Sequence, residues 1–471
     1  MQSTRARAQG SVPNSSAPGP GRVAIPGSPG TVEVGPAFPS SNPQYIIYTS
    51  GTTGRPKGII RSIGGHLVGL SYTMEHLFSI RRGDTIFTAS DLGWVVGHSY
   101  ILYGPLLVGA TTILFEGKPV GTPDASTFWR IISEWGANVL STAPTALRAI
   151  KREDPTLSLR KGFNLRSLRA IFLAGERSEP SLVEDYQNAV FGHPRDTGWR
   201  VVDNWWSSES GSPITGILLG PATTAAATTT TPAKIKPGSA GKLIPGWNLS
   251  IVDDDGEISP PTVSGNIVLR TPLAPTGFSE LWNDQSGQEF YNAYLKRFEA
   301  KGGWLDTGDA GFIDEEGYVH VMSRTDDVIN VAAHRFSTGA IEQAILLHPG
   351  IAEGYVVGCP DEIKGHVPLA VVVLRNSNSD EGERSSLLLK EINEFVRKEI
   401  GPIAALGRVV PVDKVPRTRS GKTLRRVLRA IVENAKMKKW GADVDVPATI
   451  EDSSAVPEVR EKIEKSFGRD E

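Results

Sequence analysis

Cysteine is almost absent from this chain of 471 residues, in which Cys359 is the single example. A lone cysteine excludes a disulfide within the chain and is typical of a reducing compartment, so we predict a cytoplasmic location. An excess of charge is missing as well, because the formal net charge is only −2. That balance argues against a nucleic-acid partner and against a basic face that binds a membrane.

Long apolar runs are also lacking. The longest apolar stretch runs from Ser99 to Phe115, and it is interrupted by Gly104, Pro105 and Gly109. Because it is slightly short for a bilayer span, we predict no membrane partner and, instead, a buried helix that leads into a strand.

Residues that build a core are scarce at the start of the chain, where residues 1–43 are rich in Pro, Gly and Ser. Such a segment cannot bury enough apolar surface to fold, so we predict a disordered leader. Its arginines precede the first acid, Glu33, which leaves a mitochondrial transit peptide as the alternative to the cytoplasm. Residues 220–234 have the composition of a second flexible segment, an insertion between structured pieces.

Strand-like and helical patterns alternate between residues 44 and 325. Strands are predicted at 201–206, 248–254 and 265–271, and a helix at 125–136. Alternation of this kind indicates an α/β fold with layered sheets and helices. A second pattern fills residues 326–471, with helices at 338–348 and 385–401 and strands at 351–360 and 368–375. We therefore predict a large α/β domain followed by a small α+β domain, with the joint at Arg324 to Asp327.

The stretch YIIYTSGTTGRPKG, from Tyr45 to Gly58, places a flexible loop directly after a strand-like run. Tyr and Ile predict a buried strand, and the glycines let a ligand approach the backbone closely. Hydroxyl groups and the charge of Lys57 complete a candidate phosphate cradle. The spacing is not that of a Walker A loop, which disfavours a kinase or another NTPase. A solvated glycine-rich connection is the structural alternative.

Four motifs follow one another in a fixed order: YTSGTTGRPKG, WLDTGDAGFIDEEGY, SRTDDVIN and PRTRSGK. In this order they resemble the adenylate-forming acyl-CoA synthetase superfamily. The stretches STAPTALRAI, LAGER, DNWWSSESGSPIT and DVINVAAHR are most similar to the short-chain branch, first to propionyl-CoA synthetases and next to acetyl-CoA synthetases. The resemblance covers the chain from Tyr45 onward. It implies a large adenylate-forming domain at 44–325 and a small, mobile lid domain at 326–471.

The reaction that this resemblance implies is that of an acid–thiol ligase. ATP and a short carboxylate give an acyl-adenylate and pyrophosphate, and coenzyme A then takes the acyl group as a thioester after the small domain has rotated. The implied small-molecule partners are ATP, the carboxylate and coenzyme A, with Mg²⁺ as the activating ion and no tightly bound cofactor. The oligomeric state is left open.

The nucleotide-binding residues implied by the resemblance share polar or glycine character and fall in several of the motifs. A carboxylate such as that of Asp309 suits a ribose diol, because its two oxygens can each accept a hydrogen bond. Taken alone, most of these residues would be turn or surface positions. The set is Thr49, Ser50, Gly51, Thr52, Thr53, Gly54, Gly175, Glu176, Arg177, Ser208, Asp309, Arg324 and Arg335.

Three residues match the catalytic positions of the family: Lys57, Glu209 and Lys422. Glu209 corresponds to the acid that helps to bind Mg²⁺ on the phosphates. Lys422 corresponds to the lysine that bridges carboxylate and phosphate oxygens, and a flexible stem suits a cation that must arrive and leave. Asp326 matches the hinge, where a few backbone angles absorb the domain rotation. Without the resemblance, Glu209 would be a cap or ion-pair residue and Lys422 part of a basic loop.

The acyl pocket is where this sequence indicates a substrate size. Trp206 matches the indole that closes the pocket, and Ala174 stands where acetate-using relatives carry valine. One methylene in an apolar pocket is worth only about 1–3 kcal/mol, so we expect propionate to be preferred, with acetate and butyrate behind it. Trp205 is predicted only to pack. The opposite wall is assigned to Trp94, Val95 and Val96.

Two departures from the family pattern affect this interpretation. Members of the branch carry a long segment ahead of the phosphate loop, whereas the match here starts close to that loop, as in an N-terminally truncated relative. Because a lost segment exposes apolar faces, the alternative function is a non-catalytic relic that binds nucleotide or a partner. The second departure is at Ala332 and Ala333, which match positions beside the implied coenzyme A tunnel. At the second of these positions relatives often have glycine, so the extra Cβ of Ala333 is expected to narrow the tunnel. Arg397 still matches a coenzyme A contact.

Overall fold

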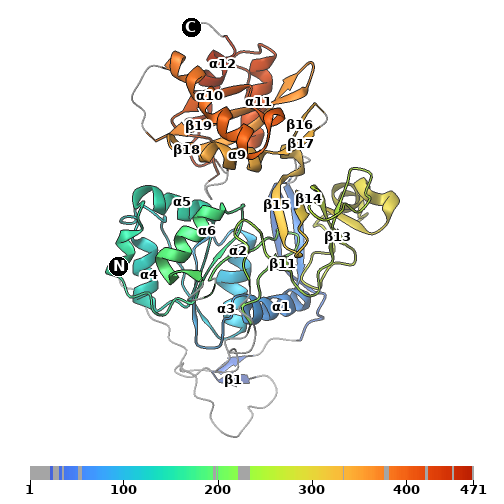
Figure 1. Ribbon diagram of the computed structural model, residues 1–471. Coiled ribbons are helices and arrows are strands. Elements are labelled where there is room, and N and C mark those ends of the chain that lie inside the picture. The colour runs from blue at the N-terminus through green and yellow to red at the C-terminus, as the bar shows by residue number, and fades with distance from the viewer. Residues whose placement is uncertain are drawn as a thin grey trace.

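The chain was analysed in a computed structural model, which has an α/β architecture built from several sheets (Figure 1). Inside the predicted leader, strand β1 (Arg22–Ala24) pairs antiparallel with β2 (Thr31–Glu33), so this part of it is not without secondary structure. Residues 221–233, most of the predicted insertion, lie outside the described residues. The structure describes residues 22–24, 31–33, 37–50, 56–194, 198, 200–220, 234–332, 334–375, 381–418, 423–447 and 450–468.

A five-stranded parallel sheet forms the centre of the N-terminal part. Successive side chains on its strands enter opposite cores, as Val139 and Leu140 do. A sheet buried on both faces requires apolar residues at nearly every position, and these strands provide them. The strand predicted from Val201 is confirmed as the edge of this sheet. The strand order is β6 (Thr111–Thr112), β5 (Thr85–Thr88), β7 (Val139–Thr142), β8 (Ala170–Leu173) and β9 (Val201–Asp203).

Helices cover both faces of the parallel sheet. The helix predicted at 125–136 is confirmed as α4, which ends at Gly136 in the left-handed conformation with φ +60°. On the same face lie α5 and α6, whereas α1 and the turn η1 pack against the other face through Leu70 and Met74. The bounds are α1 (Ile63–Tyr72), η1 (Thr73–Leu77), α4 (Thr127–Trp135), α5 (Pro144–Glu153) and α6 (Pro180–Tyr186).

The apolar stretch from Ser99 to Phe115 forms the predicted helix and strand, but the helix is buried on one side only, since Leu102 is 39% and Leu106 is 60% exposed. Tyr100 is fully buried, and Pro105 lies inside a continuous helical run from Val95 to Leu107, directly after the π-helical part His98–Tyr103. Among the described residues, no helix combines the length and apolar character needed to cross a membrane. The helical elements are α2 (Val95–Gly97), η2 (His98–Tyr103) and α3 (Gly104–Leu107), and β6 follows them.

The candidate phosphate loop joins two antiparallel strands, β3 (Pro43–Ser50) and β4 (Pro56–Ser62). Ile47 is buried against the core, but its neighbour Tyr48 is 60% exposed, so the strand predicted as buried is buried on one face only. The reason is that a two-stranded ribbon packs one face on the core and leaves the other to solvent. Lys57 lies within β4, directly opposite Thr49.

A four-stranded antiparallel sheet lies beside the parallel one and confirms the strands predicted at 248–254 and 265–271. Its strands are β12 (Leu249–Val252), β13 (Gly265–Arg270), β14 (Trp304–Ile313) and β15 (Val319–Arg324), in that order. In the ladder between β14 and β15, Asp309 is the partner of Arg324. A smaller pair, β10 (Thr215–Gly216) and β11 (Lys242–Leu243), connects this region to the core.

The C-terminal part also contains a sheet that is covered by helices on both faces. Val356 of β18 faces one core and its neighbour Val357 faces the other, with α9 and α10 on the first side and α11 and α12 on the second. All four predicted elements of this part are confirmed. The bounds are β16 (Val328–Val331), β17 (His334–Ser337), α9 (Thr338–Leu346), β18 (Ile351–Asp361), β19 (Gly365–Leu374), α10 (Glu381–Glu399), β20 (Arg408–Val412), α11 (Arg425–Lys436) and α12 (Ala455–Ser466).

Ion pairs connect the two parts of the chain. Arg152 at the end of α5 lies 3.3 Å from Glu353 of β18, and Lys118 lies 2.9 Å from Glu451. Glu353 also pairs with Arg417, which comes just before the segment 419–422. In Figure 1 the C-terminal part accordingly lies above α5 and above the ends of β14 and β15.

Candidate active site

Asp309 occupies the end of the antiparallel sheet, where it is almost fully buried. The indole Nε1–H of Trp205 donates to its Oδ2 atom over 3.2 Å, and Nη1 of Arg324 lies 3.3 Å from Oδ1. Gly308 before it has φ +70°, and a Cβ there would lie 2.5 Å from the Arg324 guanidinium. The expectation that Trp205 only packs is therefore wrong, because its N–H orients the carboxylate assigned to the ribose. The sequence offered only the adjacency of two tryptophans as a signal.

Glu209 lies in the turn that follows the two tryptophans. The Tyr294 hydroxyl donates to its Oε1 atom over 2.9 Å. Burial, together with the negative charge of Glu209, raises the pKa of Tyr294, so the phenol stays protonated and remains a donor. The backbone is held as well, because the Phe278 N–H donates to the Glu209 carbonyl over 2.9 Å and the Ser208 carbonyl accepts from Arg61.

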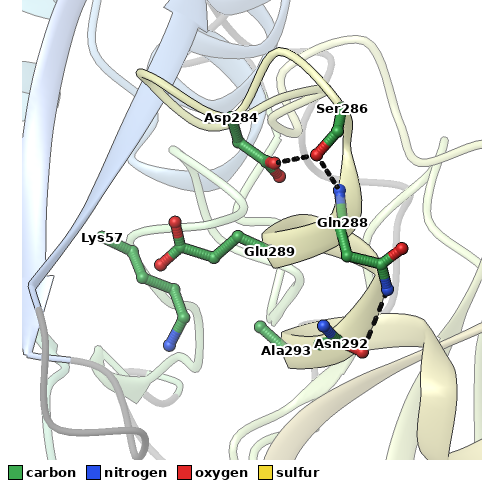
Figure 2. Close-up of a pocket in the computed structure, with 7 residues that line it drawn as sticks. All are labelled: Lys57, Asp284, Ser286, Gln288, Glu289, Asn292 and Ala293. Carbon is green, nitrogen blue, oxygen red and sulfur yellow. Dashed lines mark hydrogen bonds between the residues drawn. The ribbon is translucent and has the colours of Figure 1, made fainter.

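Lys57 lines a cavity of about 460 Å³, although its own side chain is only 4% exposed. In Figure 2 the Glu289 carboxylate points toward the Lys57 side chain across this cavity. The opposite wall is stiffened by local hydrogen bonds, such as the 3.2 Å bond from Gln288 to Asn292. The lining residues are Lys57, Asp284, Ser286, Gln288, Glu289, Asn292 and Ala293.

Adjacency in the chain, a hydrogen bond, an electrostatic interaction and an ion pair link these three places. Ala293 lines the cavity of Lys57, and the next residue, Tyr294, bonds Glu209. Tyr294 also lies within electrostatic reach of Arg324, whose charge lowers its pKa against the dominant effect of burial, and Arg324 pairs with Asp309. Residues from β4, the turn after β9, the Tyr291–Leu295 helix and β14 are thus brought to one region, although 252 positions separate Lys57 from Asp309.

The segment assigned to adenine follows β8. Gly175 adopts φ +99°, a conformation that favours glycine, and no atom lies within 4 Å of the Cβ it lacks. The Glu176 carboxylate accepts from the Thr145 N–H over 2.7 Å and pairs with Arg148. Burial lowers the pKa of the neighbouring Arg177, against the negative charge of Asp203.

The residues assigned to the acyl pocket divide between the core and the surface. Trp206 packs edge-to-face on Tyr100 with ring centroids 5.4 Å apart, and Val96 packs on the same core. Val95 is buried, whereas Trp94 is 37% exposed just ahead of α2. Ala174 continues the parallel sheet at the end of β8, where its N–H donates to Thr142 over 3.2 Å.

Several predicted site residues lie outside the described part of the chain: Gly51, Thr52, Thr53, Gly54, Ala333 and Lys422. For Ser50, Asp326 and Arg335 the description covers the backbone alone, and it places Asp326 in the short helix Thr325–Asp327 between β15 and β16. Arg335 lies in β17 opposite Asn330.

The residues assigned to coenzyme A belong to the C-terminal part. Ala332 forms the turn between β16 and β17 with φ +47°, and its N–H donates to the Lys364 carbonyl over 2.9 Å. Arg397 is exposed in the last turn of α10.

The carboxylates of this region suit a magnesium ion that binds together with a nucleotide. Among the described residues, no cluster of three or more Asp, Glu, His or Cys side chains could hold a metal ion. Mg²⁺ is commonly bound through one or two carboxylates together with substrate phosphates, and Glu209 offers one carboxylate beside the region of Lys57.

The chain belongs to the AMP-binding enzyme family. The family model described as AMP-binding enzyme matches residues 6–278, and the model described as AMP-binding enzyme C-terminal domain matches residues 340–422. The first match begins inside the segment predicted to be a leader.

Curated relatives include short-chain acyl-CoA synthetases. The chain is 47% identical over 427 residues to "Acyl-CoA synthetase short-chain family member 3, mitochondrial" of Homo sapiens, covering 91% of this chain and 58% of that protein. It is 37% identical over 430 residues to "Acetyl-coenzyme A synthetase" of Pyrobaculum aerophilum, covering 90% of this chain and 59% of the relative. The chain therefore spans little more than half the length of these proteins.

Solved structures share the fold. An anthranilate CoA ligase, AuaEII, in complex with anthranoyl-AMP matches with a TM-score of 0.67 at 26% identity, over 84% of this chain and 69% of that one. Acetoacetyl-CoA synthetase from Streptomyces lividans matches with a TM-score of 0.74 at 22% identity, over 92% of this chain and 62% of that one. The predicted α/β fold with a large N-terminal and a smaller C-terminal portion is thereby confirmed.

Proposed function

We propose that this chain activates a short-chain carboxylate with ATP and then transfers the acyl group to coenzyme A. The observation that carries the proposal is the convergence of Glu209 and Asp309, through Tyr294 and Arg324, beside the cavity of Lys57. The names of the relatives, which are acyl-CoA and acetyl-CoA synthetases, support the same reaction class.

In the proposed first step, a carboxylate oxygen attacks the α-phosphorus of ATP, and the bond to pyrophosphate breaks. Two anions must approach, so the site has to supply positive charge, which we assign to Lys57 and Lys422. Asp309, oriented by Trp205 and Arg324, accepts the ribose hydroxyls. Bound Mg²⁺ would offset phosphate charge, and Glu209 is the residue that would hold it.

In the proposed second step, the thiol of coenzyme A attacks the acyl carbon and AMP leaves. We assign coenzyme A contacts to Arg397 and to the Ala332–Ala333 turn. A rotation about Asp326 would exchange the adenylation and thioester arrangements, with residues 44–325 and 326–471 as the two moving domains.

The substrate class that we propose is a short acid with propionate preferred. Trp206 is fixed on Tyr100, so its indole can close the pocket at a defined depth. Ala174 at the end of β8 leaves the space that a longer side chain would fill. Acetate and butyrate should follow propionate as substrates.

Propionate-dependent exchange of labelled pyrophosphate into ATP tests this function, because exchange requires only the first step. We expect exchange with propionate, a lower rate with acetate, and none without acid. Well-folded protein that shows no exchange would reject the proposal. Hydrolysis of ATP without any acid would favour a nucleotidase instead.

A non-catalytic nucleotide-binding protein is the second candidate function. It would need only the contacts that hold Asp309 and Glu209 in place to bind a nucleotide, without the attack of a carboxylate on the α-phosphorus. Calorimetry that detects binding of ATP or of propionyl-adenylate, combined with absent exchange, would support this candidate.

For the compartment we propose the mitochondrion, the alternative given by the arginines at the start of the sequence. Those of the acyl-CoA synthetase short-chain family carry the word mitochondrial in their names, which supports the mitochondrial alternative over the cytoplasm. Fractionation of cells that express the full chain would decide between the two.

A further inference from the structure

We infer that Arg61 and Tyr294 are positioning residues that hold Glu209 from two sides, the first through the backbone and the second through the carboxylate. This inference rests on the proposed function, in which Glu209 contacts Mg²⁺ on the nucleotide. Neither residue belongs to the motifs that define the site, and both are identified by their contacts alone.

The turn that carries Glu209 is unusually well anchored. Every backbone carbonyl from Ser207 to Ser212 accepts a hydrogen bond from a side chain or a backbone N–H. Four of these bonds come from three side chains on other segments, namely Arg61, which makes two of them, Ser99 and Thr276. A turn whose carbonyls are all engaged has little freedom to move its side chains.

Arg61 is the central member of this arrangement, and it has no exposed surface. Its guanidinium donates to the carbonyls of Glu209, at 3.2 Å, and of Ser208 and Thr276. The planar fork of arginine spreads its donors over three nitrogens in a fixed plane, whereas the donors of a lysine ammonium all lie on one atom. Burial lowers the pKa of Arg61, against the charge of Glu209 and the hydroxyl of Tyr45.

Two glycine positions show that the surrounding chain is shaped around this guanidinium. Gly211 has φ +71°, and a Cβ there would lie 2.5 Å from Cζ of Arg61. Gly65 on α1 approaches the turn before Thr276 so closely that a Cβ would lie 1.8 Å from the Pro275 carbonyl oxygen. The close approach brings the Thr276 carbonyl within reach of Arg61.

A second buried layer supports the far end of the turn. Ser99 donates to the Gly211 carbonyl over 2.7 Å, and His66 bonds Ser99 over 3.2 Å and Gln44 over 2.7 Å. Because burial holds the pKa of His66 at about 3, the imidazole is neutral near pH 7 and has one N–H. Since the Ser99 hydroxyl donates to Gly211, the Nε2–H of His66 is the donor to Ser99.

Tyr294 acts on the carboxylate itself. Its hydroxyl occupies Oε1 of Glu209 at 2.9 Å, and its ring is fixed by Phe278, 4.9 Å away, whose N–H bonds the Glu209 carbonyl. The Tyr294 hydroxyl thereby orients one carboxylate oxygen of Glu209. A partner of this kind that orients a metal ligand is commonly worth 10- to 100-fold in metal affinity.

The first arm of the test needs no nucleotide. Hydrogen exchange is measured on wild-type protein, on Arg61→Lys and on the matched control Arg169→Lys. Arg169 also donates to a buried carbonyl, that of Ser79 at 2.8 Å, but it does so at the start of β8. We expect faster amide exchange of residues 207–212 in Arg61→Lys alone. Unchanged exchange in folded Arg61→Lys would overturn the role of Arg61.

The second arm measures ATP affinity by calorimetry with Mg²⁺ and with a chelator. We expect Mg²⁺ to increase the affinity of the wild-type protein for ATP. In Arg61→Lys and Tyr294→Phe this increase should be about tenfold smaller, whereas the affinity for metal-free ATP should be unchanged. An undiminished gain in Tyr294→Phe would overturn its role. If Arg61→Lys does not fold, Ser99→Ala replaces it in the exchange arm. Wild-type protein that binds no ATP would refute the proposed function, and the exchange arm would still decide whether Arg61 holds the turn.

Discussion

The indole of Trp205 donates its N–H to Oδ2 of Asp309 over 3.2 Å, although 104 positions separate the two residues in the chain. The bond links the turn after β9 to the middle of β14. It therefore couples the wall of the proposed acyl pocket to the residue that we assign to the ribose.

Trp205→Phe removes this donor while keeping an aromatic ring. A hydrogen bond to a charged group contributes about 1.5–3 kcal/mol, so we expect ATP to bind about tenfold more weakly. Calorimetric titration with ATP measures the change, and Trp135→Phe at the end of α4 is the control. Equal affinity of the two variants would mean that Asp309 does not need the indole.

Trp206→Gly should change which acids are used. Removing the indole opens the space beside Tyr100, and each methylene accommodated in an apolar pocket is worth about 1–3 kcal/mol. We expect kcat/KM to rise with chain length from propionate to hexanoate, whereas the wild-type order should fall. An unchanged order would place the pocket elsewhere.

Lys422→Ala should separate the two half-reactions. Since the lysine is assigned to adenylation, we expect pyrophosphate exchange to fall by about 10²- to 10³-fold, by analogy with the removal of one group that stabilises transition-state charge. The reaction of supplied propionyl-adenylate with coenzyme A should be largely spared. Equal loss in both assays would contradict the assignment.

Asp203→Asn should alter the pH dependence of stability. Burial raises the pKa of Asp203 to about 7 from an ordinary value of 3.8. The folded state then holds a proton that the unfolded state releases, so the free energy of unfolding declines as pH rises from about 4 to about 7. Urea denaturation across this pH range should show that the contribution of Asp203 to the free energy of unfolding declines by up to about 4 kcal/mol. The asparagine variant should show no such decline. Parallel curves for both proteins would show that Asp203 titrates normally.

Phe172→Ala tests the central sheet. Phe172 is fully buried on β8 and packs on Phe78 with ring centroids 4.6 Å apart. Truncation should lower the free energy of unfolding by about 3–5 kcal/mol. Phe38→Ala, at a side chain that is 63% exposed, should change it by less than about 0.5 kcal/mol. Denaturant titration of both variants provides the comparison.

Local patterns were sufficient for most of the architecture. Apolar runs such as those of β13 and β19 predict buried strands because both their faces are covered, and α9 and α10 follow from helical periodicity. The same reasoning overestimated burial in β3, since a ribbon that exposes Tyr48 has the same short sequence pattern as a central strand. Composition alone could not separate the two cases.

The contacts that organise the candidate site were not accessible in this way. Arg61 directly follows two isoleucines in β4, and its acceptors lie between 147 and 215 positions further along the chain. Tyr294 bonds a residue 85 positions earlier. Motif matching identified Glu209 and Asp309 but not the groups that hold them, because those groups are defined by tertiary approach.

The strand pairing of Lys57 with Thr49 has a consequence for how an anion could be bound beside the loop 51–55. Residues 51–55 connect two antiparallel strands, whereas in a Walker-type site the corresponding loop opens a helix. A helix would supply a fixed positive pole whatever its side chains. Strands β3 and β4 supply no such pole, so the positive charge that β4 brings beside this loop is that of the Lys57 side chain, and a single substitution at that position can change it.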